Sequence, residues 1–250
     1  MPSHLYISPH IDDAVYSCGG LIYQQTSAGD KVEIVTVCAG DPPEGFRSPF
    51  AYELETRWGE AENAIAVRRD EDFVACERVG AKPIQLNIPD AIYRRGPDGQ
   101  PLYASEEALV GPVHPSEEAL IERVGSLLRE ACSGSSIIYA PIGYGGHVDH
   151  RLVRKAVETL GKGMIYFRDM PYAARGGEIP AEFPPIMGEE TIIPLNPSEI
   201  EVWGDAIANY SSQISTFWAD VRAIHNEISE IHDHWGGIPL IETRSYTQLQ

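Results

Sequence analysis

Short apolar runs alternate along the chain with longer segments in which apolar residues recur about every three or four positions. Short apolar runs are typical of buried strands, and the longer period indicates helices with one buried face. The alternation predicts a Rossmann-like α/β fold, with a mostly parallel β-sheet covered by helices on both faces. The predicted strands are residues 5–8, 31–38, 83–88, 136–140 and 164–167, and the predicted helices are 14–28, 52–79, 116–131, 149–160 and 199–231, the last as one helix or two.

Residues that favour caps and turns separate these elements. Gly80 follows one helical segment, as expected of a C-terminal cap, and Ser116 is expected to cap the helix that it begins. Two segments, residues 91–115 and 171–185, have little periodicity and are rich in Gly, Pro and Tyr. Segments of this kind in a compact domain are typically lids or pocket walls.

A dense group of titratable residues follows the first predicted strand, where the sequence reads HIDD at residues 10–13. In an open α/β sheet, ligands bind just beyond the carboxyl ends of the strands. One imidazole and two carboxylates in this position are expected to attract a divalent cation.

A second group matches the first, because the sequence HVDH at residues 147–150 follows the strand predicted at 136–140. Carboxyl ends of parallel strands meet at one edge of a sheet, so the two groups are expected to lie together. His10, Asp13 and His150 would then form a set of two histidines and one carboxylate. Three protein ligands with a fourth position open to water are typical of catalytic zinc sites, although Fe²⁺ also accepts this set.

The remaining polar residues have plausible roles beside such a metal. Asp12 is adjacent to Asp13, and neighbouring side chains on an extended segment diverge, so Asp12 is better placed as a general base on the attacking water. His147 would protonate the leaving amine or stabilise the oxyanion. Asp149 would orient one of the histidines.

Simpler interpretations exist for each group alone. The two aspartates at 12 and 13 could be an N-cap pair, and the histidines of HVDH could be surface residues at the start of a helix. Two groups with complementary ligand types, each after a strand, favour the metal site. The other histidines are expected to be structural or solvated: His4, His114, His225, His232 and His234.

Charge and cysteine content narrow the class of protein. With 19 basic and 37 acidic residues, the net charge is −18, which argues against nucleic-acid and anionic membrane partners and favours a small-molecule substrate. The four cysteines form no Cys-x-x-Cys pair, as expected of reduced, buried thiols in a cytoplasmic protein. The sequence shows no signal-peptide pattern and no apolar run long enough to span a membrane.

The stretches SPHIDDAVYSCGG and GGHVDH resemble the LmbE-like family, also called the PIG-L deacetylases. The resemblance extends from residue 5 to at least 213, and residues 1–250 are predicted to form a single domain of this family. It implies zinc-dependent hydrolysis of an N-acetyl group, usually on a glucosamine moiety. The roles that it implies are metal ligands at His10, Asp13 and His150, a general base at Asp12, and transition-state stabilisation or protonation by His147.

Weaker parts of the resemblance concern the substrate. Arg68 and Glu71 match an Arg-x-x-Glu motif whose arginine lies near the substrate, although Arg69 could take that place and the arginine could also be an exposed residue paired with an acid. The sequence IPDA resembles a family segment whose aspartate, here Asp90, lies near the sugar pocket. The late sequence YSSQ at residues 210–213 resembles a motif expected to serve the structure.

The chain departs from the family pattern at two places. Ile11 replaces the usual proline between His and Asp-Asp, which leaves the ligand types intact but removes a constraint on the turn. The glycine-rich sequence GYGG before His147 is also unusual, and it could allow Tyr144 to reach the oxyanion.

The expected function is removal of the N-acetyl group from an N-acetylated amino sugar or its conjugate. One alternative is a zinc amidase that cleaves a larger amide, such as a thiol-sugar conjugate. Another is a non-catalytic sugar- or nucleotide-binding module, which is disfavoured because no Gly-x-Gly-x-x-Gly turn follows the first strand. Whether the chain forms a homo-oligomer is left open. Four loop aromatics could stack on a sugar, although ordinary packing is favoured for each: Tyr93, Tyr103, Tyr172 and Trp235.

Overall fold

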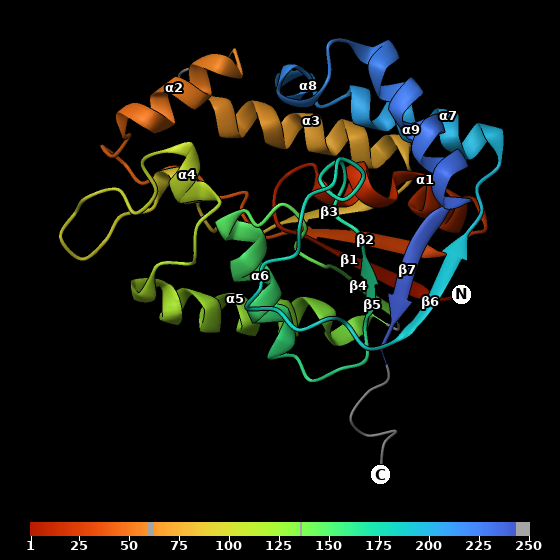
Figure 1. Ribbon diagram of the computed structural model, residues 1–250, viewed down its shortest axis with the longest axis horizontal. Coiled ribbons are helices and arrows are strands. Elements are labelled where there is room, and N and C mark those ends of the chain that lie inside the picture. Colours follow the sequence, from red (N-terminus) through yellow and green to blue (C-terminus); the bar gives the residue numbers. More distant parts are fainter. Residues whose placement is uncertain (60–62, 136, 244–250) are drawn as a thin grey trace.

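The computed structural model describes residues 1–59, 63–135 and 137–243. Its centre is a seven-stranded sheet with the order β3-β2-β1-β4-β5-β7-β6 (Figure 1). The strands β1 to β5 run parallel, and β7 and β6 are antiparallel additions at one edge. The strands are β1 Ser3–Ser8, β2 Lys31–Thr36, β3 Lys82–Gln85, β4 Ile137–Pro141, β5 Ile165–Phe167, β6 Glu189–Ile193 and β7 Ile238–Glu242.

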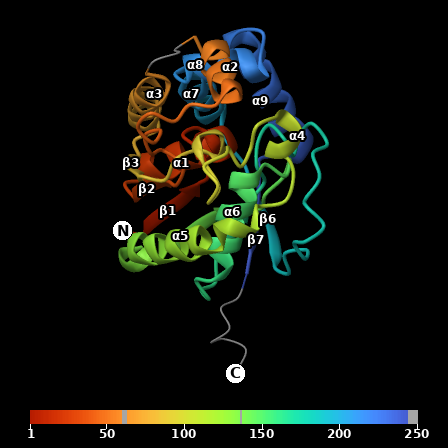
Figure 2. The same ribbon diagram turned by 90° about the vertical axis from the view of Figure 1, so that its left-hand side faces the viewer.

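Helices cover both faces of the sheet (Figures 1 and 2). One face carries α1 Asp13–Ser27, α3 Ala64–Arg78, α7 Pro197–Ala208 and α9 Val221–Trp235, and the other carries α5 Glu118–Ala131 and α6 Val148–Glu158. Alternate residues of β1 enter the two apolar cores, since Tyr6 packs toward α1 whereas Leu5 and Ile7 pack toward α5 and α6. The predicted α/β class, with a mostly parallel sheet between two helical layers, is therefore confirmed.

The sequence pattern did not predict β6 and β7. β6 reads EETII and is mostly exposed, so it lacks the apolar run that marks the central strands. β7 contains Pro239 and directly follows the Gly236-Gly237 turn at the end of α9. Of the five predicted strands, the one at 136–140 begins at Ser136, which lies outside the described residues.

Two long segments that were predicted to be helical each contain more helices than predicted. The segment 52–79 forms α2 Pro49–Arg57 and α3, because the chain turns at Trp58 and Gly59 and Gly59 has a φ of +82°. The segment 199–231 forms α7, α8 Ser211–Phe217 and α9. The apolar periodicity of the sequence continues through both segments, so it did not reveal the turns.

The predicted cap at Ser116 was also wrong. A short 3₁₀ turn, η2 Pro115–Glu117, precedes α5, and the backbone N–H of Ser116 donates to the ring of His114. In contrast, Gly80 follows α3 with a φ of +73°, as expected of a glycine that ends a helix.

The chain connectivity places the chemistry at one point of the sheet. From β1 the chain passes through α1 to β2 on one side, and from β4 it passes through α6 to β5 on the other. Because β1 and β4 are neighbours, the crossovers diverge between them, and this divergence opens a crevice beyond their carboxyl ends. HIDD leaves β1 and HVDH leaves β4 at this crevice.

Two further predictions concern side chains and membrane segments. All four cysteines are buried and free, as expected of reduced thiols. Among the described residues, none of the helices combines the length and the apolar character required to cross a bilayer.

Candidate metal centre and active site

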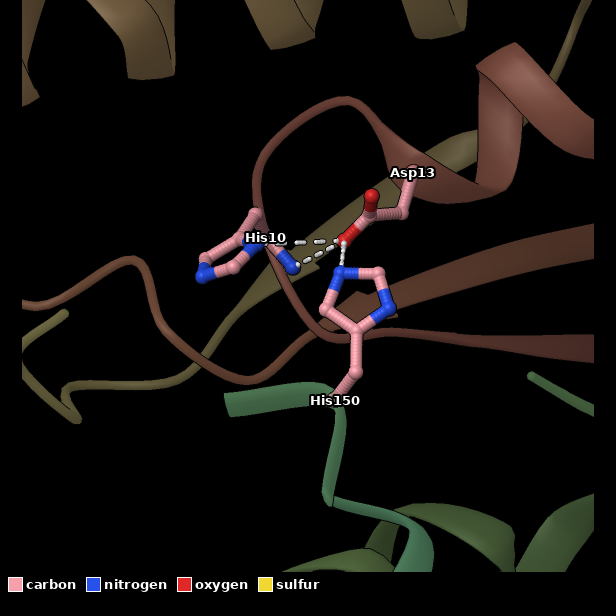
Figure 3. A group of neighbouring side chains, drawn as sticks. All are labelled: His10, Asp13 and His150. Atoms are coloured by element: carbon pink, nitrogen blue, oxygen red, sulfur yellow. Dashed lines mark hydrogen bonds and ion pairs between the residues drawn. The ribbon is translucent and has the colours of Figure 1, made fainter. Parts of the chain in front are cut away.

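The three residues that were predicted from the sequence to be metal ligands lie together in the structure. Asp13 Oδ2 lies 3.4 Å from His10 Nδ1 and 3.2 Å from His150 Nε2 (Figure 3). One potential ligand atom from each residue falls within 4.8 Å of the other two. Asp13 and His150 are buried, and His10 is accessible from the crevice, so this group could hold a divalent metal ion that remains open to a substrate.

The local structure of HIDD leaves Asp12 free of a capping role. Asp12 is the N-cap residue of α1, yet its side chain makes no capping hydrogen bond. Instead, the Ser8 hydroxyl accepts a hydrogen bond from Ala14 N at 3.0 Å and donates to His10 O at 2.6 Å. Asp13 Oδ2 accepts from His10 N at 2.7 Å, which fixes the turn. The N-cap interpretation therefore does not explain the Asp12 carboxylate.

Asp169 holds His150 in place. Its Oδ1 lies 2.8 Å from His150 Nδ1, and its Oδ2 accepts hydrogen bonds from the backbone N–H groups of Gly143 and Tyr144 at 2.7 and 3.1 Å. The ring therefore directs Nε2 toward Asp13, and this buried nitrogen makes no hydrogen bond with any residue that the structure describes. A buried imidazole nitrogen that lacks a hydrogen bond and faces a carboxylate oxygen fits a metal ion. Asp169 was missed in the sequence, although it follows β5, the strand next to β4.

The carboxylates of Asp13 and Asp169 favour a positive charge at His150, either a proton or a metal ion. Burial lowers the pKa of His150, but the carboxylates of Asp13 and Asp169 raise it to about 10. For Asp13, burial alone raises the pKa of the carboxyl group, but the neighbouring His150 and His10 bring that pKa well below its usual range. Since a metal binds neutral imidazole, occupation of the site would displace protons.

Asp149 orients His10 from the other strand loop. Its Oδ2 lies 3.0 Å from His10 Nε2 and accepts a hydrogen bond from Ala91 N, also at 3.0 Å. His10, His147 and Asp149 form a second group whose donor atoms come within 4.8 Å of one another. The first group is the better candidate, because the other oxygen of Asp149 is bound by Arg94 at 2.5 Å.

Arg94 connects this site to a buried network that the sequence did not predict. Its Nε lies 2.6 Å from Glu117 Oε1, and Tyr103 donates to the other oxygen of Glu117 at 2.5 Å. Burial raises the pKa of Asp149, but Arg94 and His10 lower it well below its usual range. Asp149 therefore carries a negative charge beside His10.

We expect Arg94→Ala to lower the free energy of unfolding by about 3–5 kcal/mol, because two buried carboxylates, Asp149 and Glu117, lose their partner. Urea unfolding measures this change. Arg57→Ala is the control, since Arg57 pairs with Glu106 at 2.6 Å while both side chains are more than half exposed. Such a surface pair contributes about 0–1 kcal/mol. Equal losses in the two variants would contradict a buried ionic network.

Arg68 and Asp12 are paired beside the metal group. Both are buried, with Arg68 Nη2 3.4 Å from Asp12 Oδ2, and the guanidinium lies 4.9 Å from the centre of the Trp58 ring. Burial raises the pKa of Asp12 to about 6, against the lowering effect of Arg68. Arg69 points elsewhere, since it donates to Ala39 O and to Asp41 at 3.0 and 2.7 Å.

His147 forms the N-cap of α6, and its Nδ1 accepts a hydrogen bond from Asp149 N at 3.2 Å. This acceptor role leaves the ring proton on Nε2. Burial and the neighbouring His10 lower the pKa of His147 well below its usual range, so the ring is neutral near pH 7. The two rings are edge to face, with centroids 4.7 Å apart.

A cavity of about 400 Å³ is lined by His10, Asp12, Asp13, Arg68 and His147. Its floor is polar and includes Asp90, whose Oδ2 lies 3.6 Å from His10 Nε2. Apolar walls come from α2 and from the segment that holds η1 Ala91–Tyr93 and α4 Glu106–Leu109. Besides His10, Asp12, Asp13, Arg68, Asp90 and His147, the lining residues are Leu54, Arg57, Trp58, Ile92, Glu106, Leu109, Tyr172, Gln213, Ser215, Thr216 and Phe217.

The remaining residues that were considered in the sequence make structural contacts, with the exception of Tyr172. Glu71 accepts hydrogen bonds from Ser211 and Ser212, which attaches the YSSQ segment at 210–213 to α3. Tyr144 packs against the apolar core beneath α6 and does not line the cavity. Of the four loop aromatics, Tyr172 lines the cavity, while the others contact Glu55 (Tyr93), Glu117 (Tyr103) and Arg168 (Trp235).

A known family and several individual proteins are similar to this chain. The model of the PIG-L family, described as GlcNAc-PI de-N-acetylase, matches residues 5–160. A 2'-N-acetylparomamine deacetylase of Niallia circulans is 28% identical over 184 residues, which cover 67% of this chain and 66% of that protein. The enzyme of the same name from Streptomyces fradiae is 32% identical over 185 residues, which cover 71% of this chain and 60% of the relative. The match thus spans less than two thirds of each curated relative.

A solved structure matches almost the whole fold. The zinc-inhibited form of teicoplanin deacetylase Orf2 is 26% identical to this chain and superposes with a TM-score of 0.85. The match covers 96% of this chain and 98% of Orf2. The similarity therefore includes the antiparallel edge and the cavity walls that lie beyond the segment matched by the family model.

Proposed function

This chain belongs to the PIG-L family, and from that membership we propose that it is a metal-dependent hydrolase that removes the N-acetyl group from an amino sugar. The observation that carries the proposal is the group of His10, Asp13 and His150, of which His10 and Asp13 line a cavity together with Asp12. The names of the matched relatives, paromamine and teicoplanin deacetylases, support the same reaction class.

His10, Asp13 and His150 are proposed to hold Zn²⁺, with Fe²⁺ as the other ion that suits two histidines and one carboxylate. When bound, such a cation would polarise the acetamide carbonyl and lower the pKa of a water molecule toward about 7. Asp169 and Asp149 fix the two histidine rings through hydrogen bonds at 2.8 and 3.0 Å. They reduce the motion of the ligand atoms and increase the basicity of the rings.

Asp12 is proposed to take the proton from the attacking water. Its carboxylate is buried, makes no capping bond and has a pKa of about 6, so near pH 7 it is ionised but still basic enough to accept a proton. The hydroxyl of the water joins the acetyl carbon, the C–N bond breaks, and the proton held by Asp12 passes to the departing nitrogen. Acetate and a free amine are the products.

His147 is proposed to stabilise the negative oxygen rather than to act as the acid. Its Nδ1 already accepts a hydrogen bond from Asp149 N, and the neutral ring therefore offers Nε2–H to the cavity. A donor that faces the oxygen of the acetyl group strengthens its hydrogen bond as that oxygen becomes negative. Of the two roles considered for His147, the tautomer favours this one.

The cavity favours one sugar ring as the bound part of the substrate. Its volume of about 400 Å³ is near the lower end of the range for small-molecule pockets. Asp90 and Arg68 are proposed to bind sugar hydroxyls, and Trp58 and Leu109 provide apolar surface. The rest of a conjugate would lie outside this cavity.

We also propose that residues 1–250 act as one catalytic domain, since the site draws its residues from α1 through α8. The buried free thiols support a cytoplasmic location.

An acetate-release assay over a panel of N-acetylglucosamine compounds tests the proposal. We expect acetate from at least one of them, loss of activity in a chelator and recovery on addition of Zn²⁺ or Fe²⁺. Metal analysis should give about one ion per chain, as expected of a single three-ligand site. Release of a longer acid instead of acetate would favour the larger-amide hydrolase. Full activity of metal-free protein would exclude the mechanism.

A further inference from the structure

Tyr172 lies on a turn that is tied to the metal group. The turn begins at Asp169, the residue that holds His150, and Ala173 N donates to Asp169 O at 2.8 Å. Gly177 N closes the turn by donating to Tyr172 O, also at 2.8 Å. The position of Tyr172 is therefore set by the same segment that orients a proposed ligand.

The ring of Tyr172 is packed on two sides. It meets the ring of His150 edge to face, with a centroid separation of 5.8 Å and an interplanar angle of 88°. It meets Phe217 in the same way at 5.9 Å. His147 contacts the same His150 ring with centroids 5.9 Å apart. Two side chains that carry a hydrogen-bond donor, His147 and Tyr172, thus adjoin one proposed ligand.

The glycine-rich sequence before His147 makes room for this ring. A Cβ atom on Gly145 would lie 2.7 Å from both Cγ and Cδ1 of Tyr172, closer than such contacts allow. Gly145 also has a φ of +79°, which side chains other than glycine rarely adopt. The GYGG sequence therefore leaves room for the Tyr172 ring, whereas Tyr144 is partly buried against the apolar core.

The hydroxyl of Tyr172 has no hydrogen-bond partner within residues 1–59, 63–135 and 137–243, and the residue lines the cavity. Two buried tyrosines near the site differ in this respect, since the hydroxyl of Tyr93 donates to Glu55 at 2.8 Å and that of Tyr210 to Asp72 at 3.0 Å. Tyr172 thus has a hydroxyl that is available as a donor to a ligand in the cavity.

We infer that Tyr172 is a catalytic residue whose hydroxyl donates a hydrogen bond to the acetyl oxygen of the substrate, an inference that rests on the proposed deacetylase function. The cavity floor carries three carboxylates, Asp12, Asp13 and Asp90, whose charges oppose a developing negative oxygen. A second neutral donor beside His147 offsets this repulsion at the transition state. The bond strengthens as charge develops, so it acts on turnover more than on substrate binding.

Tyr172→Phe tests the inference, because it keeps both ring contacts and removes only the hydroxyl. We expect kcat to fall about 100-fold, as on loss of one oxyanion donor, with KM nearly unchanged and metal content equal to wild type. A phosphonate analogue of the tetrahedral intermediate should bind the variant more weakly by a similar factor. Tyr144→Phe is the matched control and should leave kcat unchanged, since Tyr144 is partly buried against the core and does not line the cavity.

Gly145→Ala provides a second variant, because it displaces the Tyr172 ring without removing the hydroxyl. We expect it to lower kcat as well, and the double variant with Tyr172→Phe should be no slower than the slower single variant. Wild-type kcat and analogue affinity in Tyr172→Phe would overturn the inference while leaving the deacetylase proposal intact. Absence of acetate release from wild-type enzyme would instead overturn the proposed function, and with it this role.

Discussion

Replacing Asp12 by asparagine is expected to lower kcat about a thousandfold while the protein keeps its metal. General-base catalysis contributes about 10²–10⁴-fold, and asparagine cannot accept the proton. The substitution preserves shape, and the Asp12 side chain makes no capping bond whose loss would unfold α1. Asp12 is also not among the three residues proposed as ligands, so metal content should not change.

The pH dependence gives an independent signature of Asp12. Burial raises its pKa to about 6 despite Arg68, and only the ionised form accepts a proton. Wild-type activity should therefore rise as the pH increases through about 6 and fall as the pH decreases through it. The residual activity of Asp12→Asn should lack this rise. Steady-state kinetics from pH 5 to 8, with metal content measured in parallel, provide the comparison, and an unchanged profile would remove Asp12 as the base.

The second large effect is expected from His150→Ala, which should weaken metal binding by more than about 100-fold. Loss of partners that merely orient a ligand costs about 10–100-fold, and loss of the ligand itself should exceed that range. Asp169→Asn is the graded comparison, because it disturbs the 2.8 Å contact with His150 Nδ1 and leaves the imidazole present. We expect its affinity to lie between those of wild type and His150→Ala.

Titration of metal-free protein with Zn²⁺ measures these affinities without requiring activity. His234→Ala is the matched control, since His234 is exposed on α9 and belongs to neither donor group found among the described residues. Retention of wild-type affinity in His150→Ala would move the site to another set of residues, with His10, His147 and Asp149 as the next candidate.

The sequence predicted the parts of this site that depend on local order along the chain. HIDD and HVDH each follow a strand, and the rule that parallel strands share a carboxyl edge was sufficient to place the two groups together. The same rule would have drawn attention to Asp169, which follows β5. It was missed because a single aspartate after a short strand has no pattern of its own.

Contacts between distant segments could not be predicted in the same way. Arg94 reaches both Asp149 and Glu117, and nothing in the spacing of these residues indicates that they meet. The helical period also continued through Gly59, where the chain turns. Periodicity reports which residues are buried, whereas the position of a turn depends on which neighbouring element they are buried against.

The outer strands β6 and β7 were not predicted from the sequence for a different reason. A strand buried on both faces appears as an apolar run, and β1 is of that kind. β6 lies at the edge of the sheet with little side-chain burial, so its sequence resembles that of a loop. Such strands are specified by pairing with a neighbour, which a single sequence does not display.

The composition of the cavity has a consequence for how this protein can change. The proposed metal ligands, together with Asp12 and His147, lie on the segments that follow the central strands β1 and β4, whereas the walls belong mainly to α2, α4 and α8, which pack outside the sheet (Figure 2). Insertions or substitutions in α2 and α4 would reshape the cavity walls while the segments after β1 and β4 keep their positions. The scaffold therefore separates reactivity from selectivity, so that one hydrolytic apparatus can be adapted to acyl-sugars of different size by altering only the periphery.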